Sequence, residues 1–144
     1  MKKLVLVSVA ALLAASAAQS KGLKWMDGPP GLPGGAKMAV VSGDPGKEGD
    51  FKIRLKMPAN YAVPAHHHPT DERVAVVSGR LSYGMSDKLD RAKAKTLKAG
   101  QHVSMAAEMN HWVFAKAPAT IEVSGKGPFQ ITYVDPKDDP RGAK

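Results

Sequence analysis

Three consecutive histidines, His66, His67 and His68, carry the clearest chemical signal in the chain. Side chains of an extended segment alternate between two faces, so His66 and His68 point to one side and His67 points to the other. Three residues separate His68 from Glu72, and a tight turn there would return the carboxylate to the two imidazoles. Two imidazoles and one carboxylate suit a divalent ion such as zinc, manganese, iron, nickel or copper.

His111 is the candidate for a fourth ligand. It opens a second apolar segment, which ends at Phe114 and follows a turn-like stretch over residues 106–109. The sequence therefore predicts one divalent transition metal held by His66, His68, Glu72 and His111, and leaves the identity of the metal open.

The elements that must position these residues are short β-prone runs separated by Gly, Pro, Asn or Asp. Phe51–Met57 alternates apolar and polar residues without a break, which is typical of an antiparallel strand with one buried face. Many short strands at close spacing predict an all-β sandwich or barrel. The other expected strands are Met38–Val41, Arg73–Val77, Leu81–Met85, Gln101–Met105, Trp112–Phe114, Thr120–Val123 and Phe129–Val134.

Three further segments complete the organisation of the chain. Residues 86–95 are the one helical candidate. Residues 19–36 are rich in Gly and Pro and are expected to form an extended arm with Trp25 and Leu32 as apolar anchors, the alternative being a disordered leader. Residues 135–144 read as a polar tail.

Residues 1–18 have the parts of an export signal. Lys2 and Lys3 begin the segment, an apolar run extends from Leu4 to Leu13, and small residues continue to Ala18. The run is shorter than the roughly 20 apolar residues that a bilayer span needs, so cleavage is expected rather than anchoring. We therefore expect an exported protein, periplasmic or secreted, whose mature chain has no transmembrane segment. With no cysteine in the sequence, core packing and a bound metal must supply stability.

The charge distribution argues against nucleic-acid binding. The formal net charge of +8 falls to +6 when Lys2 and Lys3 leave with the signal (8 − 2 = 6). The densest basic stretch, residues 88–98, contains no aromatic residue on which a base could stack. We interpret this stretch as a solvated face, with weak attraction to acidic partners or lipid head groups as the alternative.

The histidine cluster and its surroundings resemble the first motif of the cupin family of small jelly-roll barrels. That motif has a Gly-like turn, His-x-His, three or four residues, Glu, six residues and Gly. In this chain Asn60 holds the turn position, and His66–His68, Glu72 and Gly79 follow in order.

The second cupin motif has Gly-Asp, a short apolar strand, Pro-x-Gly and then His. Residues from Gly100 to His111 follow its spacing, with Ala106 in the place of the usual Pro and Glu108 in the place of the usual Gly. The resemblance covers about residues 37–134 and implies a single jelly-roll β-barrel that encloses the metal and forms a homodimer.

The resemblance narrows the function without fixing the reaction, because cupins include dioxygenases, oxalate-degrading enzymes, isomerases and plain binding proteins. Our first hypothesis is a metal-dependent enzyme, dioxygenase- or oxidase-like, acting on a small organic molecule. The alternatives are a non-catalytic module that binds a metal or small ligand, and a structural dimer with a vestigial site. Glu108 and His102 are the candidates for proton transfer beside the ion. Candidate cavity-lining aromatic residues are Tyr61, Tyr83, Trp112 and Phe114.

Overall fold

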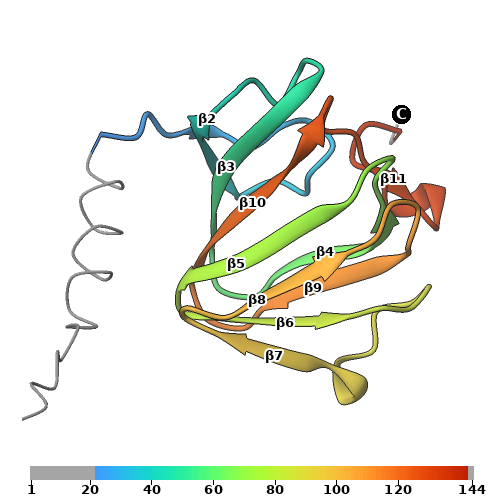
Figure 1. Ribbon diagram of the computed structural model, residues 1–144. Helices are drawn as coiled ribbons and strands as arrows, with labels where there is room; N and C mark the ends of the chain where they lie inside the picture. Colours follow the sequence, from blue (N-terminus) through green and yellow to red (C-terminus); the bar gives the residue numbers. More distant parts are fainter. Residues whose placement is uncertain (1–21, 143–144) are drawn as a thin grey trace, which may run out of the picture.

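The computed structural model describes residues 22–142, and in it two antiparallel sheets face each other (Figure 1). The first sheet has the order β1 (Met26–Asp27), β2 (Lys37–Ser42), β3 (Gly49–Met57), β10 (Ala119–Gly127), β5 (Glu72–Ser78) and β8 (His102–Met105). The second has the order β11 (Thr132–Tyr133), β4 (Tyr61–His67), β9 (His111–Ala115), β6 (Arg80–Gly84) and β7 (Lys95–Lys98). The predicted all-β class is confirmed.

The expectation of a closed barrel was wrong in one respect. Within residues 22–142 every strand pairing stays inside one of the two sheets, so the hydrogen-bond ladder does not run around the whole structure. The architecture is a jelly-roll sandwich whose two inner faces form the core.

Strict alternation places the core between the sheets. Along β3, Phe51, Ile53, Leu55 and Met57 are buried, as their spacing predicted. They belong to one core cluster with apolar residues of the other strands, such as Leu81 on β6 of the opposite sheet. The inner faces are therefore apolar, and any polar group that enters them needs a partner.

The predicted helix over residues 86–95 was wrong. This segment is a loop with one 3-10 turn, η1 (Arg91–Lys93), which Asp90 caps by accepting a hydrogen bond from the Ala92 N–H at 3.1 Å. Leu89 and Ala94 pack against a small apolar cluster on the outside of the second sheet. A residue pattern that anchors a loop at two points was thus misread as the start of a helix.

Three other segments also differ from the strands that the sequence predicted. β7 lies where the helix was expected to end, and the segment from Phe129 to Val134 is a strand only at Thr132–Tyr133. β4, which carries the histidine run, belongs to the centre of the site although its full length was not recognised as a strand.

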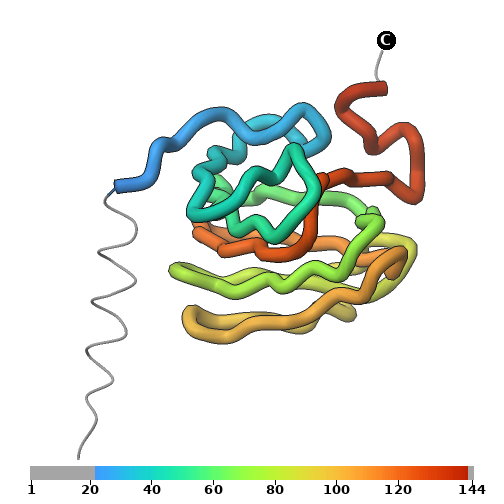
Figure 2. Tube along the Cα trace, turned by 45° about the horizontal axis from the view of Figure 1, so that its top comes forward, coloured from blue at the N-terminus to red at the C-terminus, as the bar shows by residue number. Residues whose placement is uncertain are grey.

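The Gly- and Pro-rich segment before β2 lies against the two sheets, and in Figure 2 it runs in blue along their upper side. The Tyr61 hydroxyl donates a hydrogen bond to the Pro33 carbonyl at 2.6 Å, and the Tyr133 hydroxyl donates to the Gly31 carbonyl at 2.6 Å. Leu32 between them is buried, and Trp25 lies under the Lys56 ammonium group. The arm is therefore fixed by both side-chain anchors and hydrogen bonds to its main chain.

After β11 the chain forms a 3-10 turn, η2 (Pro136–Asp138). Arg141, which follows this turn, donates a hydrogen bond to the Ile131 carbonyl at 2.7 Å. The export signal predicted at residues 1–18 lies outside the described residues. Within the described range no helix has the length and apolarity to cross a membrane.

Candidate metal centre

Four predicted ligands meet between the sheets. His66 and His68 come from β4 and the residue after it, His111 begins β9, and Glu72 begins β5. The ladder pairs His66 directly with His111. One ring nitrogen from each of the three histidines lies within 4.8 Å of the others. The three imidazoles could therefore hold one metal ion.

Each of these imidazoles is oriented by a main-chain carbonyl. The Nδ1 atoms of His66, His68 and His111 lie 2.7, 2.7 and 3.0 Å from the carbonyl oxygens of Pro64, Gln130 and Met109. A carbonyl only accepts, so each Nδ1 carries a proton and donates it. The Nε2 atoms are consequently directed into the cluster, in the way that metal-binding histidines are usually oriented.

Glu72 closes the cluster from the first sheet. Its Oε2 lies 2.8 Å from His68 Nε2, and its Oε1 lies 3.9 Å from His111 Nε2. The side chain is only 11% exposed. The carboxylate thus contacts the same Nε2 atoms that would face an ion.

Burial and the Glu72 carboxylate shift the pKa values of the three imidazoles in different directions. Burial, with the neighbouring His111 and His68, lowers the pKa of His66 to about 3. Burial also lowers the pKa of His111. Burial opposes the charged form of His68, but the hydrogen bond and charge of Glu72 raise its pKa above the ordinary value. The pKa of Glu72 is lowered, because contact with His68 outweighs the effect of burial.

One atom tests whether the site fits a metal. Among the described residues, His111 Nε2 is buried and has no hydrogen-bond partner. An unpartnered buried nitrogen costs free energy, because it has lost its contact with water and gained nothing. A divalent ion at the centre of the cluster would satisfy it, and imidazole nitrogen with carboxylate oxygen is a donor set for such ions.

The chamber around these four residues is small and apolar. It is about 30 Å³ in volume, room for about two water molecules. The remaining lining residues are Leu32, Leu55, Met57, Val63, Val74, Val113, Ile121, Val123 and Phe129. The arm therefore supplies one wall through Leu32.

Phe129 covers one side of the cluster and was not among the predicted site residues. Its ring stacks on His68 with centroids 5.1 Å apart and meets the Phe51 ring edge-on at 5.7 Å. It also lines a narrow cleft that leads outward past His68 and Glu72. Phe129 thus separates the chamber from that cleft.

The predicted proton-transfer residues lie elsewhere. Glu108 is 66% exposed and contacts His67, which faces away from the cluster; the Glu108 Oε2 to His67 Nε2 distance is 3.2 Å. His102 is exposed on β8. Neither residue lines the chamber: His102 has the outward parity on β8, and Glu108 lies in the turn before β9.

The aromatic residues expected to line the cavity do not line it either. Trp112 and Phe114 alternate with the inward positions of β9 and form the outer cluster with Ala65. Tyr61 and Tyr83 pack in or against the main core. Alternation around His111 was the signal that could have excluded Trp112 and Phe114.

The unusual residues in the two motifs adopt the backbone conformation of the residues they replace. Asn60 and Glu108 both have φ of 61°, in the left-handed region that glycine normally occupies. Gly79 has φ of 78°, and a Cβ there would lie 2.7 Å from the Pro118 carbonyl oxygen. The turn before His111 therefore forms with Glu108 in the glycine position.

Comparison with known proteins places the chain in a family and a fold. A family model described as "Domain of unknown function (DUF4437)" matches residues 14–132. None of the curated proteins matches the chain.

Solved structures share its architecture. The polyketide cyclase RemF from Streptomyces resistomycificus is similar with a TM-score of 0.66 and 14% identity, over 83% of this chain and 84% of that one. A putative acetylacetone dioxygenase from Methylibium petroleiphilum PM1 gives 0.65 and 19%, over 85% and 82%. An RmlC-like cupin from Shewanella frigidimarina NCIMB 400 gives 0.59 and 13%, over 74% and 85%. The fold is that of the cupins, as the motifs predicted.

Proposed function

Because this chain belongs to the family described as a domain of unknown function (DUF4437), we propose its function from its own site. It is an exported cupin that binds one divalent transition metal through His66, His68, Glu72 and His111. The centre serves dioxygenase- or oxidase-like chemistry on a small molecule.

The observation that carries this proposal is the common orientation of the three imidazoles. Each Nδ1 is held by a carbonyl, which leaves three Nε2 atoms directed at one another inside an apolar chamber. Without a bound ion this arrangement leaves His111 Nε2 unsatisfied. A metal ligand set explains both facts.

The lining of the chamber bears on the choice between an enzyme and a binding module. Once bound, an ion there would supply Lewis acidity and, in the case of iron, copper or manganese, electron exchange with the substrate or dioxygen. The chain contributes four ligands and an apolar wall that excludes water. Among the residues that line the chamber, no acid or base stands apart from the four ligands, which favours the non-catalytic module over a reaction that needs a separate proton carrier.

The fold neighbours are compatible with this proposal. One of the proteins that shares the architecture is described as a putative acetylacetone dioxygenase, which acts on a small organic molecule as the name says. Its sequence identity of 19% carries the fold and not the substrate, so the substrate must come from experiment.

Elemental analysis of protein purified from its own compartment tests the metal. We then expect the loaded protein to consume oxygen with a member of a panel of phenols, diketones and oxalate. His111→Ala should abolish both metal content and oxygen consumption, whereas His67→Ala, a matched change on the opposite face of β4, should retain both. A loaded protein that consumes no oxygen and alters no member of the panel would contradict the enzymatic proposal.

The volume of the chamber favours one other function, a non-catalytic metal-binding module. Space for about two water molecules does not admit an organic substrate beside the ion unless the walls move. Azide added to the copper-loaded protein distinguishes the two functions, because an accessible ion changes its visible spectrum on binding azide and a sealed ion does not.

Export is the part of the proposal that rests on residues 1–18. Their basic start, apolar run and small residues support removal during translocation. N-terminal sequencing of the protein from the periplasm or medium should find a chain that starts shortly after Ala18. The homodimer implied by the cupin motifs stays a prediction, which light scattering would test.

A further inference from the structure

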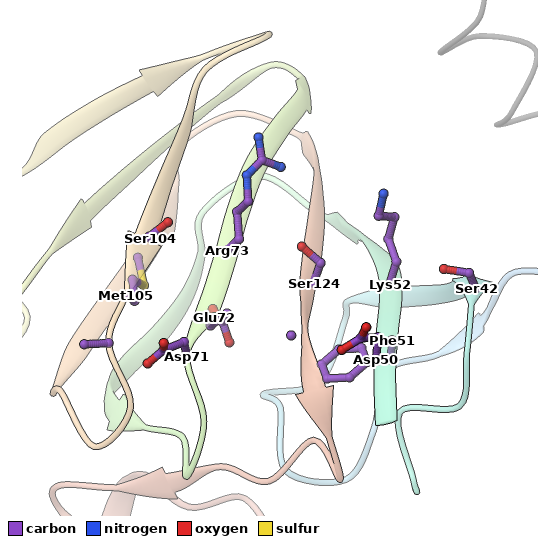
Figure 3. Close-up of a pocket in the computed structure, with 12 residues that line it drawn as sticks. Ser42, Asp50, Phe51, Lys52, Asp71, Glu72, Arg73, Ser104, Met105 and Ser124 are labelled. Carbon is purple, nitrogen blue, oxygen red and sulfur yellow. The ribbon is translucent and has the colours of Figure 1, made fainter. Parts of the chain in front are cut away.

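A hollow of about 580 Å³ lies along the first sheet and shares only Glu72 with the lining of the metal chamber. Its volume is within the range of roughly 300–1,000 Å³ that is usual for small-molecule sites. Figure 3 shows Arg73, Ser124 and Lys52 on three neighbouring strands along it. The other residues that line the hollow have no part in the proposed metal site.

The strand register aligns five polar side chains across the hollow. Ser42 pairs with Lys52, Lys52 with Ser124, Ser124 with Arg73, and Arg73 with Ser104. These residues form one row over β2, β3, β10, β5 and β8. Directly opposed side chains lie about 5 Å apart at Cβ, so the row alternates hydroxyl and cationic groups at regular spacing.

The two cations of this row are incompletely neutralised. Arg73 is exposed and makes no ion pair among the described residues. Lys52 lies 3.6 Å from Glu122, but the same carboxylate binds Arg54 at 3.0 Å. Strands are about 4.8 Å apart, which places the Cα atoms of Lys52 and Arg73 roughly 10 Å from each other across Ser124. A ligand with a negative group at each end could contact both cations at this spacing.

Three carboxylates, those of Asp50, Asp71 and Glu72, also line the hollow. Asp50 pairs in register with Lys126 on the adjacent strand. The Asp71 side chain accepts a hydrogen bond from the Ala107 N–H at 2.8 Å. Glu72 points inward to His68. Asp71 and Glu72 are thus engaged with partners outside the row, and Asp50 lies opposite Lys126 in the strand register.

Residues of the next register row also line the hollow. Below the polar row the register aligns Phe51, Gly125, Glu72 and Met105, and the position between Phe51 and Glu72 has no side chain. A Cβ on Gly125 would lie 2.8 Å from the Asp71 carbonyl oxygen. Glycine at this position therefore allows the Asp71 carbonyl to approach β10 closely, and the row carries no side chain between Phe51 and Glu72.

We propose that the row Ser42–Lys52–Ser124–Arg73–Ser104 is a binding site for a small dicarboxylate. The guanidinium group of Arg73 and the ammonium group of Lys52 bind the two carboxylates, and the serine hydroxyls donate to their remaining oxygens. The five side chains of this row have the outward parity of their strands, and none of them is a proposed metal ligand.

Calorimetric titration with succinate at low ionic strength tests this site in the purified full chain. Arg73→Gln should weaken binding by about tenfold or more, the expected loss of a charge-assisted hydrogen bond, and Lys52→Gln should weaken it in the same direction. Arg80→Gln, an exposed arginine on β6 of the other sheet, is the matched control and should bind like the unaltered chain.

Three outcomes would overturn the proposal: no saturable binding of succinate, equal binding by the Arg73→Gln variant, or equally tight binding of inorganic phosphate, which would reduce the site to a general charge effect. His111→Ala separates this site from the metal centre. Unchanged succinate binding in that variant supports the outer site, whereas its loss would mean that succinate binds the ion instead. Failure of the metal proposal would leave the succinate result intact.

Discussion

Polar side chains on the inner and outer faces of the same strands differ in their burial and in their contacts. On β4 and β5 the inward side chains of His66 and Glu72 are buried, orient one another and have shifted pKa values. Their neighbours His67 and Arg73 point outward into or near solvent. Adjacent residues on one strand thus belong to different environments, a buried cluster on the inner face and a solvent-exposed row of polar side chains on the outer face. The difference teaches that parity, more than residue type, decides which polar groups can bind an ion here.

The largest effect should come from removing inward ligands. The double variant His66→Ala/His68→Ala should lose nearly all bound metal, because two of the four ligands disappear. Inductively coupled plasma analysis of the purified protein measures this, and His67→Ala is the outward control. Metal content and stability unchanged in the double variant would mean that the site is vestigial.

Acid should destabilise the ion-free protein through the inner face. The pKa of His66 falls from 6.5 to about 3 on folding, so between these pH values the unfolded chain binds more protons than the folded one. Stability is therefore lost as pH decreases through this window, by about 5 kcal/mol for this residue alone. The lowered pKa values of His111 and Glu72 act in the same direction, while the raised pKa of His68 opposes them.

Urea unfolding of the chelator-treated protein from pH 7 to pH 3.5 measures this loss. His66→Gln should flatten the dependence on pH, whereas His102→Gln on the exposed edge of β8 should leave it unchanged. A dependence equally steep in both variants would remove His66 as its cause.

Smaller effects are expected from substituting two aromatic residues, Phe129 beside the metal chamber and Phe114 on the outer face of the second sheet. Phe129→Ala should open the chamber and speed extraction of the metal by a chelator by about tenfold, at a cost of about 2 kcal/mol, since its ring is only half-buried. Phe114→Ala on the outer face should cost about 3 kcal/mol and leave the extraction rate unchanged. Stopped-flow absorbance with a chromogenic chelator gives the rate; equal acceleration in both variants would show that general loosening, not a removed cover, is responsible.

The smallest effect should come from the outer row. Lys52→Gln removes a partly exposed ion pair with Glu122 and should change the free energy of unfolding by less than about 1 kcal/mol. Thermal unfolding measures the change. A larger loss would make Lys52 a structural residue and would require the dicarboxylate titrations to be repeated with Lys52→Arg, which keeps the charge.

The sequence was informative where a local rule determines the outcome. Alternation alone assigned His66 and His68 to one face and His67 to the other, and the structure confirms this parity. The spacing of the second motif predicted that His111 would lie beside the other histidines, although Glu108 replaces the usual glycine. The turn forms because Glu108 adopts the left-handed conformation that glycine would have there. The buried faces of the strands follow from the same rule.

Features that depend on distant pairing were not accessible from the sequence. The carbonyl of Gln130 orients His68 from 62 positions away, and Phe129 reaches the cluster through a connection without regular structure. The outer row requires the register of five strands, which no local pattern specifies. The helix expected over residues 86–95 failed because Leu89 and Ala94 are fixed by tertiary contacts with Trp112 and Phe114.

The carbonyl partners of the three imidazoles have a consequence for divergence and for redesign. Pro64, Gln130 and Met109 hold the rings with main-chain oxygens, which every amino acid possesses. Substitutions at these three positions should leave the orientation of the imidazole rings unchanged as long as the backbone path is preserved. Engineering of the donor geometry must therefore reroute the backbone, and relatives can vary freely at the supporting positions while inheriting the same imidazole arrangement.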